Sequence, residues 1–295
     1  MANGFNVTGI DSLNDYYNPE IKKVNIAKVL KNKNFTFIHA DINCVAEFDK
    51  WNDFDYIFHL AAQPGVRNSW GNSFEIYVRN NISLTQKLLE SLKYSKKLKK
   101  FFFASSSSVY GEITSEKVSE MDSVRPHSPY GVTKLAAENL CELYRKNFNV
   151  PTVSLRFFTV YGPRQRPDMA FSRLIKSAIM GDLFTVYGDG NQLRDYTFVS
   201  DIVEGVIKVT LKENIYGIYN IAGGFVISIN EVISLVQKVT GKKLNLEYNA
   251  SEKGDVFRTG ADTEKIMNDL NFSAAVNIVE GITHQYNYII RNTNE

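Results

Sequence analysis

Short apolar segments alternate with longer helical patterns in the first half of the chain, and this alternation limits the possible folds more than any other feature. The strand candidates are Phe5–Ile10, Phe35–His39, Tyr56–Leu60, Lys100–Ser105 and Thr152–Phe157. The helical patterns are Glu20–Leu30, Asn81–Tyr94 and Gly131–Phe148. Crossovers this long between strands predict an α/β protein with a doubly wound parallel sheet.

The pattern changes after about residue 160, where helical stretches mix with shorter strand candidates. The helical stretches are Phe171–Met180, Asp201–Leu211 and Ile229–Thr240, and the strand candidates are Phe184–Tyr187, Tyr219–Ala222 and Leu244–Tyr248. We expect residues 1–160 to form a first domain that continues in part beyond residue 160. Residues 161–295 are expected to form mainly a smaller, discontinuous substrate-binding lobe.

Composition excludes several classes of function. The 295 residues are 44% hydrophobic, and the formal net charge of +2 gives no strong field toward nucleic acid or membrane surfaces. Cys44 and Cys141 lie far apart without metal-ligand spacing, so we expect no metal site and a reduced, cytoplasmic protein. No apolar run approaches the length of a membrane span.

Polar or small residues come directly after several strand candidates. They are Asp11, Asp41, Ala61–Gln63 and Ser105–Ser108. Ligands of doubly wound sheets bind at the carboxyl ends of the strands. The sequence therefore predicts a cofactor crevice at this edge of the sheet.

A tyrosine and a lysine stand four positions apart, at Tyr130 and Lys134. This spacing puts both on one helix face, where an ammonium lowers the pKa of a neighbouring phenol and makes it a better general base. The spacing alone also fits a pair on a helix surface. Here it follows the strand motif FFFASSSSVYG, whose strand-terminal serine can relay a proton from a sugar hydroxyl.

Seven segments carry a resemblance to a known family. They are GIDSLNDYY, HLAAQPGVRNS, FFFASSSSVYG, SPYGVTK, LRFFTVYGPRQRPDMAF, YGDGNQLRDYTFVSDIVEG and GDVFRTGADTEK. Over nearly its whole length the chain resembles the nucleotide-sugar epimerases of the extended short-chain dehydrogenase/reductase family. The resemblance implies a Rossmann-type sheet, NAD as cofactor, a UDP-sugar substrate and a homodimer that pairs the helices at Asn81–Tyr94 and Gly131–Phe148. It also implies a role in supplying precursors of surface polysaccharides.

The resemblance assigns roles to individual residues. Ser106 is implied as the catalytic serine, Tyr130 as the base and Lys134 as its electrostatic partner. The expected cofactor-binding residues are Asp11, Asn14, Asp41, Ile42, Leu60, Ala61, Ala62, Gln63, Asn81, Ser105, Tyr130 and Lys134. The expected substrate-binding residues are Arg67, Ser107, Ser108, Thr159, Arg166, Arg173, Arg194, Asp255 and Arg258.

Asp11 carries a further expectation about the cofactor. A carboxylate at the end of this strand accepts hydrogen bonds from a ribose 2′-hydroxyl and repels a 2′-phosphate, which favours NAD over NADP. A turn or helix-capping aspartate is the alternative.

The implied reaction is epimerisation at C4 of the sugar. Tyr130 removes the proton of the 4-hydroxyl while C4 gives a hydride to NAD, and the hydride returns to the other face of the 4-keto sugar. Related dehydratases and decarboxylases carry an acidic residue just before the Val-Tyr-Gly step. The run Ser105–Ser108 has none, so we prefer an epimerase.

The segment Thr159–Phe171, TVYGPRQRPDMAF, resembles UDP-glucuronate 4-epimerases. Arg173, with the hydroxyls of Thr159 and Ser107, has the chemistry to bind a C6 carboxylate, because a guanidinium matches a carboxylate with two hydrogen bonds. The alternative is that the arginines of this region bind only the diphosphate or pair with Asp168.

The start of the sequence departs from the family pattern. Family members begin with a strand, a Gly-x-x-Gly-x-x-Gly turn and a helix, whereas MANGFNVTGID corresponds to the end of that helix and the second strand. We therefore expect the first βα unit, with its pyrophosphate-binding turn, to be missing. A start site assigned too late, a shortened piece and a genuinely shorter chain are three explanations, and weak binding of NAD is the expected consequence.

Two other functions remain open at this point. The substrate could be UDP-glucose or UDP-N-acetylglucosamine rather than UDP-glucuronate. The chain could also be an inactive relic that binds a nucleotide sugar without turning it over.

Overall fold

The computed structural model describes residue 1, residues 4–45 and residues 48–293, and these fall into two compact units, Met1–Lys50 and Trp51–Glu295. In the first unit, β1 (Val7–Asp11) pairs in parallel with β2 (Phe35–His39). Helix α1 (Pro19–Ala27) connects them and begins where Asn18 caps the backbone N–H of Glu20 ahead of a proline, a residue favoured at the first helical position. The short 3-10 turns of this unit include η1 (Val29–Lys31) and η2 (Ile42–Cys44).

A four-stranded parallel sheet is the centre of the second unit, in the order β3-β4-β5-β9. Its strands are β3 (Tyr56–His59), β4 (Lys100–Ser106), β5 (Thr152–Phe157) and β9 (Gly217–Ile221). Because β9 comes from beyond residue 160, the sheet takes strands from both halves of the chain. The strands β1 and β2 form the two-stranded sheet of the first unit.

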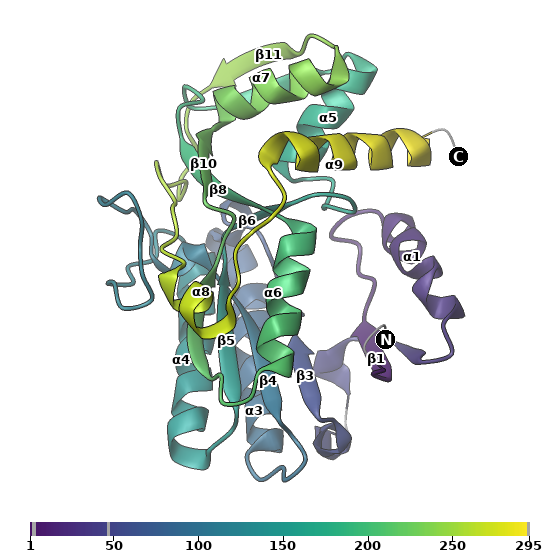
Figure 1. Ribbon diagram of the computed structural model, residues 1–295, viewed down its shortest axis with the longest axis vertical. Helices are drawn as coiled ribbons and strands as arrows, with labels where there is room; N and C mark the ends of the chain where they lie inside the picture. The colour runs from purple at the N-terminus through teal and green to yellow at the C-terminus, as the bar shows by residue number, and fades with distance from the viewer. Residues whose placement is uncertain (2–3, 46–47, 294–295) are drawn as a thin grey trace. The chain divides into compact units, whose positions relative to one another are not determined.

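Helices cover the two faces of the four-stranded sheet differently (Figure 1). On one face, β4 and β5 pack with α6 (Val199–Leu211) and α8 (Glu264–Leu270) in an apolar cluster that includes Phe102 and Leu155. On the other face, α4 (Pro129–Phe148) contacts β4 and β5 and packs beside α3 (Leu84–Leu92). The short helix α2 (Phe74–Tyr77) and a π-helical segment, Val78–Ser83, lead into α3.

The remaining elements of the second unit form a lobe with its own core, in which Phe171, Val232 and Ile282 are fully buried. Its strands are β6 (Thr159–Tyr161), β7 (Leu183–Tyr187), β8 (Leu193–Phe198), β10 (Phe225–Ser228) and β11 (Asn245–Asn249). They form one sheet in the order β10-β8-β6 and a parallel pair, β11-β7. Its helices are α5 (Ala170–Met180), α7 (Ile229–Thr240) and α9 (Ile278–Thr293), which gather at one end of the unit in Figure 1.

The predicted fold class, a Rossmann-like parallel α/β sheet, is confirmed, and the predicted β5 agrees residue for residue. Sequence reasoning missed β6, β8, β10, α8 and α9, which are short or have mixed polarity. The division of function at residue 160 stays a prediction. Across the described helices, none is both long and apolar enough to cross a membrane.

Candidate active site

One face of α4 contacts three consecutive residues at the carboxyl end of β4. Tyr130, Lys134 and Glu138 repeat every four residues along this face. Lys134 Nζ donates to the carbonyl oxygen of Ala104 at 2.8 Å, and Ser105 Oγ donates to Glu138 Oε2 at 2.7 Å. The Ser106 hydroxyl lies close enough to the Tyr130 phenol to lower its pKa. The fold therefore brings the three predicted catalytic residues together.

The start of α4 explains why glycine follows Tyr130. Ser128 caps the helix by accepting a hydrogen bond from the Gly131 N–H at 3.1 Å, and Pro129 occupies the first turn. A Cβ on Gly131 would lie only 2.5 Å from the carbonyl oxygen of Ser108. Glycine here lets the helix approach the serine segment closely enough for Tyr130 to reach Ser106.

Burial dominates the electrostatics of the tyrosine and the lysine. It raises the pKa of Tyr130, and the Ser106 hydroxyl and the positive charge of Arg166 act against it. Burial also lowers the pKa of Lys134 to about 8. The sequence predicted that Lys134 would lower the pKa of Tyr130, but in this structure Ser106 and Arg166 have that effect while the Lys134 ammonium is directed at a backbone carbonyl.

The serine segment beyond β4 is a single 3-10 turn, η7 (Ser107–Val109). Ser106 Oγ accepts a hydrogen bond from the Ser108 N–H at 3.1 Å, and the hydroxyls of Ser106 and Ser108 are also 3.1 Å apart. Ser106, Ser107 and Ser108 are all half-buried, whereas Ser105 is buried. The exposed edges of these hydroxyls can contact a ligand beside Tyr130.

Asn81 ties the loop after β3 to α4. Its Oδ1 accepts from the Gln63 N–H at 2.7 Å, and its Nδ2 donates to the Gln63 carbonyl at 3.1 Å and to Thr133 Oγ1 at 2.9 Å. Asn81 lies in the π-helical segment, a rare geometry that is frequent at functional sites. Asn81 therefore positions the loop that contains Gln63, while its predicted contact with the cofactor stays a prediction, and Thr133 is a partner that sequence reasoning missed.

The carboxyl end of β3 presents small and apolar groups to solvent. Leu60 and Ala61 are exposed, Ala62 is half-buried and Gln63 is held by Asn81. The buried His59 before them contacts Thr85 Oγ1 at 2.9 Å, and burial, followed by the charge of Lys134, lowers the pKa of His59 to about 3. A flat ring system can lie against this strip beside Lys134.

A second group of predicted residues meets around the loop at 255–258. Arg67 pairs with Asp255 at 2.8 Å and stacks 4.2 Å from the centre of the Tyr187 ring. Arg194 donates to the carbonyl oxygens of Val256 and Phe257 at 2.7 and 3.2 Å. Arg258, the remaining member of the group, donates through Nε to the carbonyl oxygen of Glu116 at 3.2 Å. This arginine-rich group suits a diphosphate or the ribose of a nucleotide.

The two arginines near Thr159 occupy different surroundings. Arg166 forms a two-fold ion pair with Asp168, with both distances 3.0 Å, and its charge reaches Tyr130. Arg173, on α5, lies 5.1 Å from the centre of the Phe184 ring. Thr159 begins β6 and is half-buried. Of these two arginines, Arg166 is the one whose charge acts on the predicted base.

The remaining predicted cofactor residues belong to the first unit. Asp11 Oδ1 accepts from the Leu13 N–H at 2.7 Å at the end of β1, and Asn14 Oδ1 accepts from Lys22 Nζ at 2.7 Å. Asp41 caps η2 by accepting from the Asn43 N–H at 2.9 Å, and Ile42 begins that turn. Asp11 and Asp41 thus make local turn contacts as well as following strands, which leaves their cofactor role a prediction.

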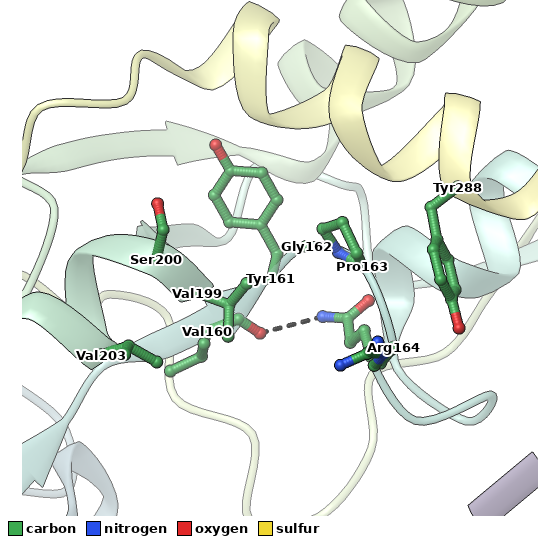
Figure 2. Close-up of a pocket in the computed structure, with 10 residues that line it drawn as sticks. Val160, Tyr161, Gly162, Pro163, Arg164, Val199, Ser200, Val203 and Tyr288 are labelled. Carbon is green, nitrogen blue, oxygen red and sulfur yellow. Dashed lines mark hydrogen bonds between the residues drawn. The ribbon is translucent and has the colours of Figure 1, made fainter. Parts of the chain in front are cut away.

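A cavity of about 550 Å³ lies against the start of α6 and residues Val160–Gln165, which follow Thr159 and precede Arg166 in the chain. Figure 2 shows Val160, Val199 and Val203 on its wall, with the Tyr161 ring directed away from them. The dashed line is the hydrogen bond from the Gln165 side chain to the Val160 carbonyl, 2.9 Å long. The walls of this cavity are largely apolar, and we assign the cavity no part in the chemistry.

Sequence reasoning missed several buried polar residues beneath the serine segment. Glu138 binds Arg156 through two hydrogen bonds, and Arg156 reaches the hydroxyl of Tyr110 at 2.8 Å. The signal that could have found Glu138 was its position four residues after Lys134 on the same helix face. No spacing rule points to Arg156. Among the described residues no cluster of His, Cys, Asp and Glu is suited to hold a metal ion.

Comparison with known sequences and structures defines the class of protein. Residues 1–222 match the NAD-dependent epimerase/dehydratase family, and the chain belongs to that family. The match begins at the first residue, so it lends no support to the expected loss of a first βα unit.

Individual relatives are similar over nearly the whole chain. An uncharacterized UDP-glucose epimerase of Bacillus subtilis is 43% identical, over 96% of this chain and 90% of that protein. A UDP-glucuronate 4-epimerase of Thermodesulfobacterium geofontis is 36% identical, over 98% and 90%. The solved structure of a UDP-glucuronic acid 4-epimerase from Bacillus cereus, in complex with UDP-glucuronic acid and NAD, is 43% identical with a TM-score of 0.95, over 98% of this chain and 92% of that one.

Proposed function

We propose that this protein interconverts UDP-glucuronate and UDP-galacturonate at C4 of the sugar. The broader activity, an NAD-dependent epimerase of UDP-sugars and hence an isomerase, follows from the family and from relatives that share it over nearly the whole chain. The uronate as substrate is the finer proposal, and it is supported by the surroundings of Tyr130.

The proposal that the substrate is a uronate rests on the effect of Arg166 on Tyr130. Burial raises the pKa of the Tyr130 phenol, and the Ser106 hydroxyl and the positive charge of Arg166 oppose that rise, so we assign the carboxylate to Arg166. C6 is two bonds from C4 in a hexose, and its carboxylate would therefore come within reach of the same guanidinium. Arg166 pairs with the half-exposed Asp168, and an exposed ion pair of this kind holds its geometry weakly.

The side chains near the base have separate tasks in this proposal. Tyr130 takes the proton of the 4-hydroxyl, Ser106 orients that hydroxyl, and Lys134 carries positive charge beside the reacting group. The hydroxyls of Ser107 and Thr159 complete the contacts to the carboxylate. Holding the carboxylate restrains the 4-keto sugar, a β-keto acid, from losing CO2.

The described residues also fit NAD. In the second unit, the exposed Leu60 and Ala61 and the buried Lys134 suit a nicotinamide ring with its ribose. In the first unit, taken by itself, the carboxylate of Asp11 suits the hydroxyl groups of a ribose. Bound there, NAD would supply the acceptor for the hydride of C4 and the donor that returns it. The protein supplies the position of the sugar and the proton transfers.

The nucleotide part of the substrate is assigned to the group around residues 255–258. Arg194 and Arg258 offer donors for the diphosphate, and Asp255 offers a carboxylate to the uridine ribose. Arg67 now binds Asp255, so we propose that the two separate or re-pair when the nucleotide enters. Arg173 is proposed to contact the diphosphate.

A homodimer is proposed on the exposed sides of α3 and α4. Val132 and Leu143 on α4 are 48% and 55% exposed, and Ile76, ahead of α3, is 39% exposed. Exposed apolar side chains on α4 and on the short helix α2, which contacts α4 and leads toward α3, suit a symmetric helical contact between two copies. Light scattering measures the mass in solution, and a monomer at micromolar concentration would contradict this proposal.

The substrate test measures both directions of conversion with purified protein and no added NAD. We expect UDP-glucuronate and UDP-galacturonate to interconvert, and Arg166→Met to lower kcat/KM for UDP-glucuronate about a hundredfold, as expected for loss of a charged hydrogen-bonded pair. Arg173→Met is the matched control, with a smaller effect on choice between acidic and neutral sugars. If the protein turns over UDP-glucose but not UDP-glucuronate, the proposal of a uronate substrate is wrong.

UDP-glucose is the second candidate, because the Bacillus subtilis relative is named a UDP-glucose epimerase. In that case Arg166→Met would leave turnover of UDP-glucose nearly unchanged. An inactive nucleotide-sugar binder is the third candidate, and calorimetry with NAD tests it. If the protein binds NAD and turns over either UDP-sugar, the hypothesis of an inactive binder is excluded.

A further inference from the structure

A buried ion pair lies directly behind the serine segment. The guanidinium of Arg156, on β5, binds the carboxylate of Glu138, on α4, with Nε–Oε2 at 3.0 Å and Nη2–Oε1 at 2.5 Å. The side chains are 3% and 1% exposed. Burial acts to lower the pKa of Arg156, but the hydrogen bonds to Glu138 and the charge of Glu138 raise that pKa overall. The pair is therefore charged and fixed in orientation by two parallel hydrogen bonds.

The same ion pair holds both ends of the segment Ser105–Tyr110. At the beginning, the Ser105 hydroxyl donates to Glu138 Oε2 at 2.7 Å. At the end, Arg156 Nη1 donates to the Tyr110 hydroxyl at 2.8 Å, and that hydroxyl is 2.7 Å from Asn220 Oδ1 on β9. Between these two anchors lie Ser106, whose hydroxyl acts on the predicted base, and Ser107 and Ser108, which are proposed to contact the substrate.

Tyr110 remains a neutral hydrogen-bonding group in this arrangement. Burial raises the pKa of its phenol to about 12, although Arg156 acts in the opposite direction. The protonated hydroxyl accepts from Arg156 and donates to Asn220, so it links β5 to β9 without adding a charge. Asn220 is itself held, since its Nδ2 donates to the carbonyl oxygen of Val118 at 2.8 Å.

The location of the pair argues against a role in stability alone. Two charges withdrawn from water lose hydration that their attraction only partly returns, and apolar residues of similar volume are often as stable or more stable. A two-fold ion pair does fix distances and angles across elements, which apolar packing does less well. Here it joins α4, β4 and β5 at the strand ends where the three predicted catalytic residues meet.

We propose that Glu138 and Arg156 are positioning residues for epimerisation, which set the Ser106 hydroxyl against Tyr130 by fixing both ends of the segment Ser105–Tyr110. Neither touches the sugar or the cofactor in this assignment. The inference rests on the proposed roles of Ser106 and Tyr130. It predicts that loosening either anchor lowers kcat more than it raises KM and makes Tyr130 a weaker acid, because the Ser106 hydroxyl lowers the pKa of that phenol.

The experiment uses four variants of the full chain, assayed on whichever UDP-sugar the wild-type protein turns over. Ser105→Ala removes the first anchor, Tyr110→Phe removes the second, and Glu138→Met with Arg156→Met replaces the ion pair by apolar side chains. Ser177→Ala is the matched control, because it removes a buried hydroxyl in α5, far along the chain from the segment. Thermal unfolding, kcat, KM and the pH dependence of kcat are measured for each.

We expect kcat to fall about tenfold for Ser105→Ala and for Tyr110→Phe, with KM changed less than about twofold. The rising limb of kcat with pH is expected to move to higher pH. The double methionine variant is expected to unfold at or above the wild-type temperature with kcat lowered at least as far. Ser177→Ala is expected to keep the wild-type rate and pH profile.

The inference is overturned by wild-type kcat and pH profile in both single-anchor variants, or by wild-type kcat in a folded double methionine variant. The single-anchor variants decide the question if the double variant does not fold. Loss of the proposed base is a separate result: a Tyr130→Phe variant with full activity would overturn the proposed function, whereas inactive Tyr130→Phe with unaffected anchor variants would overturn only this inference.

Discussion

The two faces of the central four-stranded sheet differ in chemistry, and β5 shows the difference within six residues. Val153 and Leu155 point to one face and pack with α6 and α8 among Phe102, Ile202 and Phe272. The alternate residues include the buried Thr152 and Arg156, which contact Cys141 and Glu138 of α4. One face is an apolar core, whereas the other buries charges and hydroxyls.

This contrast shows where stability and chemistry reside. Burying the apolar face removes hydrocarbon from water, the main favourable contribution to folding. The α4 face buries Lys134, Glu138, Arg156 and His59, groups whose removal from water opposes folding unless hydrogen bonds compensate. We infer that the apolar face supports a site that would not be stable by itself. Four predictions test this comparison.

The largest effect is expected from the polar face, at the proposed base. Tyr130→Phe should lower kcat about a thousandfold, within the range for loss of a general base, while the unfolding temperature stays close to wild type. Steady-state rates and thermal melts check both parts. Tyr144→Phe, on the same helix but bonded to Glu90, should retain activity. Comparable losses in both variants would show that damage to α4, not loss of the base, is responsible.

The apolar face should respond in the opposite way. Leu155 is 1% exposed, so Leu155→Ala is expected to lower the free energy of unfolding by about 2–5 kcal/mol through lost burial and a residual cavity. The fraction that remains folded should keep most of its kcat. Urea unfolding and active-site-corrected rates measure the two quantities. Leu183→Ala, at a 58% exposed position, is the control. A large loss of kcat with little loss of stability in Leu155→Ala would contradict the assignment of stability to the apolar face and of chemistry to the α4 face.

Lys134 should be a site where activity and stability oppose each other. Burial lowers the pKa of Lys134 from 10.5 to about 8, which corresponds to about 3 kcal/mol against folding when the ammonium is charged. Lys134→Met should therefore raise the free energy of unfolding at pH 7. The lost hydrogen bond to Ala104 should reduce this gain by about 1 kcal/mol. The same substitution should abolish activity.

The sign of the pH dependence follows from the direction of this shift. Below pH 8 the lysine is charged in both states and opposes folding fully, and that opposition fades as pH rises toward 10.5. The stability advantage of Lys134→Met should consequently shrink between pH 7 and pH 10 in urea unfolding. Lys146→Met, exposed on the same helix, should show no such trend. An advantage that is constant with pH would contradict this origin.

The smallest expected effect belongs to His59. Burial lowers the pKa of His59 to about 3, so the folded protein keeps it neutral while the unfolded chain binds a proton below about pH 6.5. Stability is thus lost as pH falls, by about 1 kcal/mol between pH 6.5 and 5.5 from this residue. His59→Gln, which can keep a bond to Thr85, should lack that part of the loss. Identical acid dependence in variant and wild type would exclude His59 as its source.

Local signals explain most of what could be predicted. The helix expected at Gly131–Phe148 begins at Pro129 because a serine cap and a proline precede the apolar pattern, and it ends where Asn149 adopts a left-handed conformation. Tyr130 and Lys134 were recognisable because helix geometry fixes residues four apart. Arg67 and Asp255 pair across 188 positions of sequence, and no local pattern links them.

The choice between Arg166 and Arg173 shows where such patterns stop. Both stand in one segment with the same chemistry, and the sequence favoured Arg173 for the carboxylate. The fold directs Arg173 over Phe184 and leaves the charge of Arg166 acting on Tyr130. The direction of a side chain depends on the elements that pack around it, and the spacing of residues in the sequence does not predict that direction.

By itself the sequence determined the alternation of strands and helices, the strand-end serines and the tyrosine–lysine helix face, because each follows from local periodicity. Only the tertiary structure decided that Glu138 would meet Arg156 and that this pair would hold both ends of the serine segment. The physical reason is that a buried charge needs a partner, and that partner is supplied by whichever strand packs against the helix.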